Sequence, residues 1–223
     1  MSNRLKKRVI MKARVINFNS GTIGKAYRNQ DYNLVVMGFN GAEKVKYSKE
    51  LSGETTKLKD LADYSETSEK TLVAAFDTDN YGIIKHSAGV FDGGKLLGIS
   101  DMTVAYSDSP YMPGAHGKLY DTACGKIAVA IGDDLLRFEL FKSFAVCGAE
   151  TVIAVRKGES SEINTVLLRA YSYLLGFPIL LVCKDKTFAS NVKGELVEPK
   201  DDVFELVPIY DFSIKTTKIK LNK

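Results

Sequence analysis

The sequence lacks any long apolar run and contains few cysteines. Its longest apolar stretch, residues 174–183, is interrupted by a glycine and a proline, and no run approaches the roughly 18–20 residues that a membrane helix needs. The three cysteines, Cys124, Cys147 and Cys183, stand far apart, without a CxxC pair. This pattern argues against a disulfide framework and against a structural zinc site. We therefore expect reduced thiols and no membrane-spanning helix.

A secretory signal is also lacking. Residues 1–8 are rich in lysine and arginine, but neither an apolar segment nor a small-residue cleavage site follows them, so we expect a cytoplasmic protein. The formal net charge is +4, and lysines gather in both tails. Basic tails can bind nucleic acid or anionic lipid. Because no aromatic stacking motif or basic helix accompanies them, we favour tails that only keep the protein soluble, with no nucleic-acid or membrane partner.

The chain of 223 residues, 45% hydrophobic and 26% charged, has the balance of one globular domain. Short β-branched runs alternate with amphipathic segments, which is typical of a layered α/β domain, and we expect at most a short helix between the first two strands. The expected strands are 13–18, 34–37, 72–76, 82–91, 127–131, 151–155, 179–183, 195–197 and 204–209, and the expected helices are 55–69, 134–147 and 162–175. We divide the chain into a basic extension (1–11), one domain (12–212) and a basic tail (213–223).

Two local signals add detail to this pattern. Asp92-Gly93-Gly94 stands between two apolar runs, and because glycine and aspartate tolerate positive φ, this predicts a hairpin turn. Asp133 or Asp134, directly after the strand 127–131, can cap the helix that follows.

Several motifs occur in an order that resembles the nitrilase (carbon–nitrogen hydrolase) superfamily. Residues 87–97 resemble the hairpin T-A-x-x-F-D-x-x-G-K-L-L of that family, and residues 119–141 resemble its run D-T-x-x-G-K-I-G-x-x-I-C-Y-D-x-R-F-P-E-L. Residues 148–150 match the G-A-E that follows, and residues 167–170 resemble an L-x-R-A helix. The similarity covers about residues 12–210 and is dense from 87 to 183. It implies a single-domain, four-layer αββα sandwich.

The family's chemistry uses a cysteine nucleophile, a glutamate that transfers protons and a lysine that stabilises the oxyanion. The resemblance places Phe39 at the glutamate position, Asp101 at the lysine position and Gly132 at the cysteine position. Phenylalanine and glycine cannot perform these roles, and aspartate reverses the charge. The resemblance therefore implies a pseudoenzyme, kept for binding or regulation, in which no catalytic residues are expected.

The alternative is an active carbon–nitrogen hydrolase, an amidase acting on a small amide, with a relocated catalytic set. Its candidates are Glu43, Lys95 and Cys183, although a solvated charge at Glu43 and a core thiol at Cys183 are the simpler interpretations. His86 lies within an expected strand, where we favour a half-buried surface residue over a base.

The former pocket is the expected binding site for a small-molecule ligand, with Asp101, Asp133 and Tyr111 as its candidate residues. Asp101, Asp133, Asp134 and His116 could converge on a hard metal ion, but we favour capping by the two adjacent aspartates, and we expect no metal and no cofactor. The resemblance also implies a homodimer formed through the helices at 134–147 and 162–175.

Overall fold

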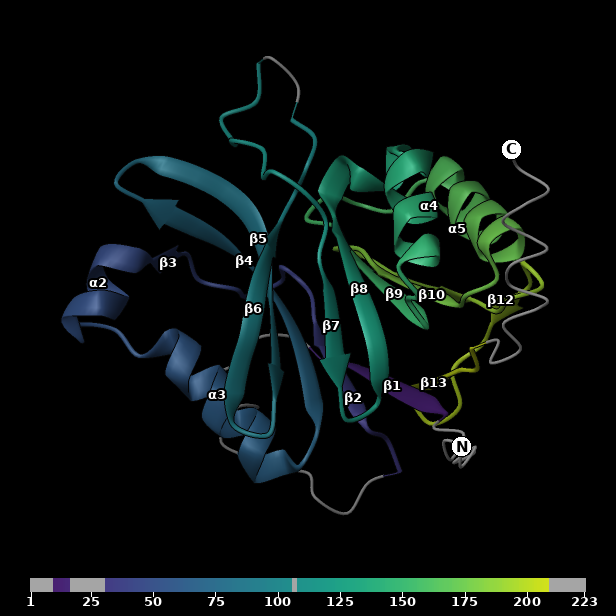
Figure 1. Cartoon of the computed structure of the whole chain (residues 1–223), viewed down its shortest axis with the longest axis horizontal. Helices are drawn as coiled ribbons and strands as arrows, with labels where there is room; N and C mark the ends of the chain where they lie inside the picture. The colour runs from purple at the N-terminus through teal and green to yellow at the C-terminus, as the bar shows by residue number, and fades with distance from the viewer. Residues whose placement is uncertain (1–9, 17–30, 106–107, 209–223) are drawn as a thin grey trace, which may run out of the picture.

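The computed structural model describes residues 10–16, 31–105 and 108–208. The two expected basic tails, and the segment in which we expected at most a short helix, lie almost entirely outside the described residues. Two β-sheets pack face to face, and helices cover their outer faces (Figure 1). The predicted four-layer αββα sandwich is therefore confirmed. Within the described residues, no helix combines the length and the apolar character that crossing a membrane would need.

The first sheet has seven strands in the order β13-β1-β2-β4-β5-β6, with β3 paired to β4. Strands β1, β2 and β4 run parallel to one another, and β5 and β6 follow as an antiparallel hairpin with the predicted turn at Gly93 and Gly94. The strands are β1 (Met11–Ile16), β2 (Leu34–Met37), β3 (Val45–Lys46), β4 (Thr71–Asn80), β5 (Ile83–Asp92), β6 (Lys95–Asp101) and β13 (Val203–Leu206).

The second sheet has six strands in the order β12-β11-β10-β9-β8-β7. Its central strands β8, β9 and β10 are parallel, and the others are antiparallel to their neighbours. The strands are β7 (Leu119–Thr122), β8 (Gly125–Ile131), β9 (Thr151–Val155), β10 (Ile179–Val182), β11 (Thr187–Ser190) and β12 (Leu196–Val197).

The helices are α2 (Tyr47–Ser52), α3 (Lys57–Ser68), a 3-10 turn η1 (Gly132–Leu136), α4 (Phe138–Val146) and α5 (Glu162–Leu175). The expected helix at 162–175 is confirmed, and α3 lies inside the expected 55–69. The prediction of a single helix over residues 134–147 is wrong. Arg137 has extended backbone angles, φ −105° and ψ 92°, which separate η1 from α4.

The central strands are buried on both faces, and their alternation defines an inner and an outer side. In β4, Val73 and Ala75 face the other sheet, whereas Leu72, Ala74 and Phe76 face α3. In β8, Ile127 and Val129 belong to the core between the sheets, whereas its alternate residues pack against α4 and α5. These assignments decide which side chains can meet in the middle of the sandwich.

Candidate functional site

The carboxyl ends of parallel strands from the two sheets meet at one end of the sandwich. After β2, the Asn40 side-chain amide donates a hydrogen bond to the Lys184 carbonyl oxygen after β10, at 2.6 Å. After β9, the Lys157 ammonium donates to the Asp77 carboxylate near the end of β4, at 2.7 Å. Polar side chains at the ends of parallel strands are the usual place for a site in such folds. The residues at this end of the sandwich are therefore the candidates for a functional site.

Gly132 lies at this end of the sandwich and is the first residue of η1. The Met102 side chain fills the space in front of it. Its φ is +58°, and a Cβ built on it would lie 2.6 Å from the Met102 Sδ atom. Met102 is 4% exposed and shares the core between the sheets with Phe39. Met102 therefore lies in front of Gly132 and shares a core with Phe39, two of the three positions that the resemblance predicted to have lost catalytic residues.

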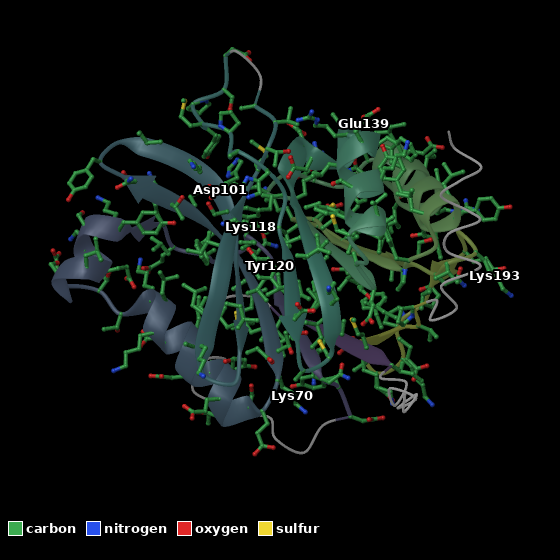
Figure 2. The ribbon with its side chains drawn as sticks, viewed as in Figure 1. Lys70, Asp101, Lys118, Tyr120, Glu139 and Lys193 are labelled. Atoms are coloured by element: carbon green, nitrogen blue, oxygen red, sulfur yellow. The ribbon has the colours of Figure 1, made fainter. Side chains whose placement is uncertain are left out.

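Asp101 does not join them, so its predicted place in the pocket is wrong. It pairs across the sheet with Ser87, on the outer face, and its carboxylate accepts hydrogen bonds from the Ser87 hydroxyl (2.8 Å) and the Lys85 ammonium (2.9 Å). The inner-facing residues on either side of it are Ser100, whose hydroxyl lies 2.9 Å from that of Tyr120, and Met102. Figure 2 shows Asp101 near the upper end of β6, with Tyr120 lower down on β7. Because side chains alternate along a strand, one residue of offset moves the charge to the opposite face.

A polar cluster occupies the inner face at the same end of the sandwich. The His86 Nδ1 atom lies 2.6 Å from the Asp77 carboxylate, directly across the β4–β5 pair. The Lys157 ammonium approaches the same carboxylate and also lies 3.3 Å from the Tyr111 hydroxyl. The Tyr111 ring stacks on the His86 ring, with centroids 3.5 Å apart, and Phe39 contacts His86 edge-on at 5.3 Å. We call Phe39, Asp77, His86, Tyr111 and Lys157 the inner cluster.

The charged groups of the inner cluster pair with one another. Burial raises the pKa of Asp77, but hydrogen bonds from His86 and Lys157 outweigh that effect, and the pKa is lowered overall. The carboxylate is thus ionised near neutral pH. An imidazole oriented by a carboxylate resembles part of a general-base pair, yet here the Tyr111 ring stacks on it and Phe39 makes a T-shaped contact with it. His86 was expected to be a half-buried surface residue; it is partly buried, with its side chain 12% exposed, and it faces the core between the sheets.

Sequence reasoning missed Asp77 and Lys157 as members of this cluster. The signal for Asp77 was available, because it continues the inner-face alternation of Val73 and Ala75 and is therefore an acidic residue directed into the core. No local signal identifies Lys157, since it lies 80 residues from the carboxylate it contacts. Of the three predicted ligand residues, only Tyr111 belongs to the inner cluster.

The remaining candidates are placed elsewhere or are already paired. Asp133 lies 3.3 Å from the Arg156 guanidinium, and the exposed Glu43 pairs with Lys57 at 2.6 Å. Cys183 packs on the outer face of its sheet, in the core under α4 and α5, where burial raises the pKa of its thiol to about 11. His116 is exposed. In the part of the chain that the structure describes, no three His, Cys, Asp or Glu side chains are grouped to hold a metal ion.

Asp134, unlike Asp133, is buried and acts as a local cap. Its carboxylate accepts hydrogen bonds from the Thr103 backbone N–H and hydroxyl, both at 2.7 Å, and from the Ile131 N–H at 3.1 Å. It therefore fixes the turn after β8 and the residue next to Met102. Asp134 lies inside η1 and accepts the N–H of its N-cap residue, Ile131, whereas α4 begins after Arg137 with no side-chain cap, so the predicted capping of the helix at 134–147 is wrong.

Comparison with solved structures identifies the fold. A carbon–nitrogen hydrolase from Helicobacter pylori G27 aligns over 96% of this chain and 93% of its own, with 16% identity and a TM-score of 0.71. Saccharomyces cerevisiae Nit3, of branch 10 of the nitrilase superfamily, aligns over 96% of both chains, with 16% identity and a TM-score of 0.73. A mutant amidase from Nesterenkonia sp. AN1, whose active-site cysteine carries the product of Michael addition of acrylamide, aligns over 95% of this chain and 98% of its own, with 13% identity and a TM-score of 0.69.

At these identities the likeness establishes a shared fold, that of the nitrilase superfamily. No protein-family model matches the sequence, and a sequence search of curated proteins finds no relative.

Proposed function

We propose that this nitrilase-fold chain is a non-catalytic binding or regulatory protein, and that it does not hydrolyse carbon–nitrogen bonds through a thiol. The observation that carries the proposal is the position of Met102 in front of Gly132. A nucleophile on that turn needs open space in which a substrate carbon can approach it. Here the Met102 Sδ atom would lie 2.6 Å from a Cβ at residue 132, so the approach is occupied.

The backbone at Gly132 supports the same conclusion. Its φ of +58° is a conformation that side-chain-bearing residues adopt only with strain. A catalytic residue can persist in such a strained conformation because the chemistry requires it. Glycine adopts the conformation without strain, so Gly132 needs no such requirement. Phe39, 9% exposed, adds an apolar side chain to the core between the sheets. The former centre is thus suited to packing and binding and has lost the groups that would transfer protons.

The second candidate is an active amidase built from Glu43, Lys95 and Cys183. Lys95 and Asp101 stand at opposite ends of β6. A rise of about 3.3 Å per residue places them roughly 20 Å apart. Cys183 faces the α4–α5 side, and its raised pKa keeps it a thiol near neutral pH. Hydrolysis by this set would require a rearrangement that brings the three side chains to one point.

The test is prolonged incubation of the protein with acetamide and propionamide, followed by NMR. We expect both amides to remain intact, with no ammonia released beyond the rate of buffer alone. Turnover that is abolished in a Cys183→Ser variant would overturn the proposal and establish the second candidate.

Acrylamide labelling provides a control for this experiment. A mutant of the amidase from Nesterenkonia sp. AN1 carries the product of Michael addition of acrylamide at its active-site cysteine. In this chain we expect only the exposed Cys147 to react, at the rate of an ordinary thiol, because Cys124 and Cys183 are buried with raised pKa values. Mass spectrometry of peptides identifies the labelled residue, and rapid labelling of Cys183 would contradict the proposal.

We further propose that the chain forms a homodimer through α5. Leu168, Tyr171 and Leu175 of this helix are buried against the sheet. A second apolar row, Ile163, Val166 and Tyr173, is 54%, 51% and 57% exposed. The spacings of three and seven residues place this row on one face of the helix. The same face on a second copy would cover it symmetrically.

A Val166→Glu substitution tests the dimer. We expect it to weaken association by about two orders of magnitude, because a carboxylate would be buried without a partner. Light scattering coupled to size-exclusion chromatography gives the mass of the wild type and the variant. Leu51→Glu on α2, at a residue 85% exposed, is the matched control and should leave the mass unchanged. A monomeric wild type would disprove this part of the proposal.

A further inference from the structure

The Tyr111 side chain occupies a position that resembles that of a bound aromatic ligand. Its ring lies on the imidazole of His86 with centroids 3.5 Å apart and planes inclined by 27°. Phe39 contacts the same imidazole edge-on, at 5.3 Å and 70°. A platform formed by His86 and backed by Phe39 therefore holds one planar ring. That ring comes from residues 108–118, the described segment that leads into β7.

The polar end of Tyr111 is also recognised. The Lys157 ammonium lies 3.3 Å from the phenolic oxygen and donates to it, and it stands 5.6 Å from the ring centroid. The same ammonium donates to Asp77, which holds His86 through Nδ1. The site therefore binds two features of the side chain, a planar ring that stacks on His86 and an oxygen that accepts a hydrogen bond from Lys157.

The loop that carries Tyr111 is held by contacts that do not involve the ring. The Met112 N–H donates to the Ile84 carbonyl at 2.8 Å, and the Gly114 N–H donates to the Met102 carbonyl at 2.7 Å. The ring itself is held by stacking, by packing against the edge of the core between the sheets, and by one hydrogen bond at the long end of the usual range. A side-chain rotation can thus withdraw the ring from His86 while these two backbone bonds remain.

We propose that His86, Phe39 and Lys157 form a binding site for a planar aromatic molecule bearing a hydroxyl or carboxylate group, and that Tyr111 closes this site when the ligand is absent. The ligand ring stacks on His86 in place of Tyr111, and its oxygen accepts the Lys157 hydrogen bond. This inference deepens the proposed function, on which it rests, because it names the class of molecule that the non-catalytic site would bind.

The experiment uses the full chain and 4-hydroxybenzoate as the probe. The chain has only two histidines, His86 and the exposed His116, so imidazole proton signals report on the site with an internal control. In wild type, the probe should move the His86 signals in a saturable way and leave those of His116 unchanged. Without the probe, the His86 signals of Tyr111→Ala should differ from those of wild type, because the ring current of Tyr111 is lost. When the probe binds to this variant, the signals should return toward their wild-type position.

The variants provide the quantitative test. We expect Tyr111→Ala to bind the probe about tenfold more tightly than wild type, because the ligand no longer competes with Tyr111. Lys157→Met in the Tyr111→Ala background should lose most of that affinity, and Tyr81→Ala, at an exposed tyrosine on the β4–β5 turn, should behave as wild type. His86 signals that stay unchanged in Tyr111→Ala at saturating probe would overturn the inference. That outcome differs from failure of the proposed function, which would appear as amide turnover whether or not the probe binds.

Discussion

Replacing Asp134 with alanine is expected to lower the free energy of unfolding by about 3 kcal/mol. The carboxylate is 1% exposed and accepts three hydrogen bonds, two from Thr103 and one from the Ile131 N–H. Alanine leaves the buried Ile131 N–H and the partly buried Thr103 donors without this acceptor, which is the costly way to lose a hydrogen bond. Asn at this position retains one oxygen for Thr103 and should cost about 1–2 kcal/mol. Urea unfolding followed by circular dichroism measures both values.

The same residue gives the chain a dependence of stability on pH. Burial raises the pKa of Asp134, although the donors from Thr103 and Ile131 partly oppose the shift. The folded chain therefore binds this proton more tightly than the unfolded chain does. The resulting stability is fully present below the unfolded pKa of about 3.9 and decreases as the pH rises through the folded value. Asp134→Asn cannot titrate, so its deficit relative to wild type should be larger at pH 4 than at pH 7.

The adjacent Asp133 is the matched control. Its side chain is 28% exposed and forms an ion pair with Arg156 at 3.3 Å. Such pairs contribute at most about 1 kcal/mol, so Asp133→Ala should be well tolerated. Equal costs at the two positions would show that the three hydrogen bonds of Asp134 do not hold the turn after β8.

Replacing Gly132 with alanine is expected to lower the free energy of unfolding by about 2–5 kcal/mol. The φ of +58° costs an L-residue about 1–2 kcal/mol. The added Cβ would also lie 2.6 Å from the Met102 Sδ atom, and overpacking of a core typically costs about 1–3 kcal/mol. Thermal and urea unfolding of purified variants measure the total. The result bears directly on the proposed function, because the cost of overpacking measures how closely Met102 fills the space in front of residue 132.

Two further variants separate strain from crowding. Gly148 has φ +87° and nothing within 4 Å of a built Cβ, so Gly148→Ala should cost only the backbone strain, about 1–2 kcal/mol. In a Met102→Ala background, Gly132→Ala should fall to the same cost, because the crowded atom is gone. If Gly132→Ala and Gly148→Ala cost the same in the otherwise wild-type chain, the space before residue 132 is open and the main support for a non-catalytic site is lost.

The sequence alone was sufficient for most of the architecture. Strands at 34–37 and 151–155 and the helix at 162–175 appear at the predicted bounds, because their apolar patterns match a single period over their whole length. The hairpin at Gly93 and Gly94 follows from local backbone freedom. The helix at 134–147 failed at Arg137, where an apolar pattern continues across a break that only the backbone angles reveal.

The sequence also supplied the prediction that the family's nucleophile and base are missing, because the identity of a residue at a matched position needs no coordinates. It could not determine which side chains fill the gap. Asp101 and Met102 are neighbours in the chain, and the cross-strand register of Ser87 with Asp101 decides that the methionine, and not the aspartate, faces Gly132. The contact between Lys157 and Asp77 joins two sheets across 80 residues. Local patterns specify strands and turns, whereas the contents of a site between two sheets depend on how those sheets are registered and packed against each other, which only the tertiary structure decides.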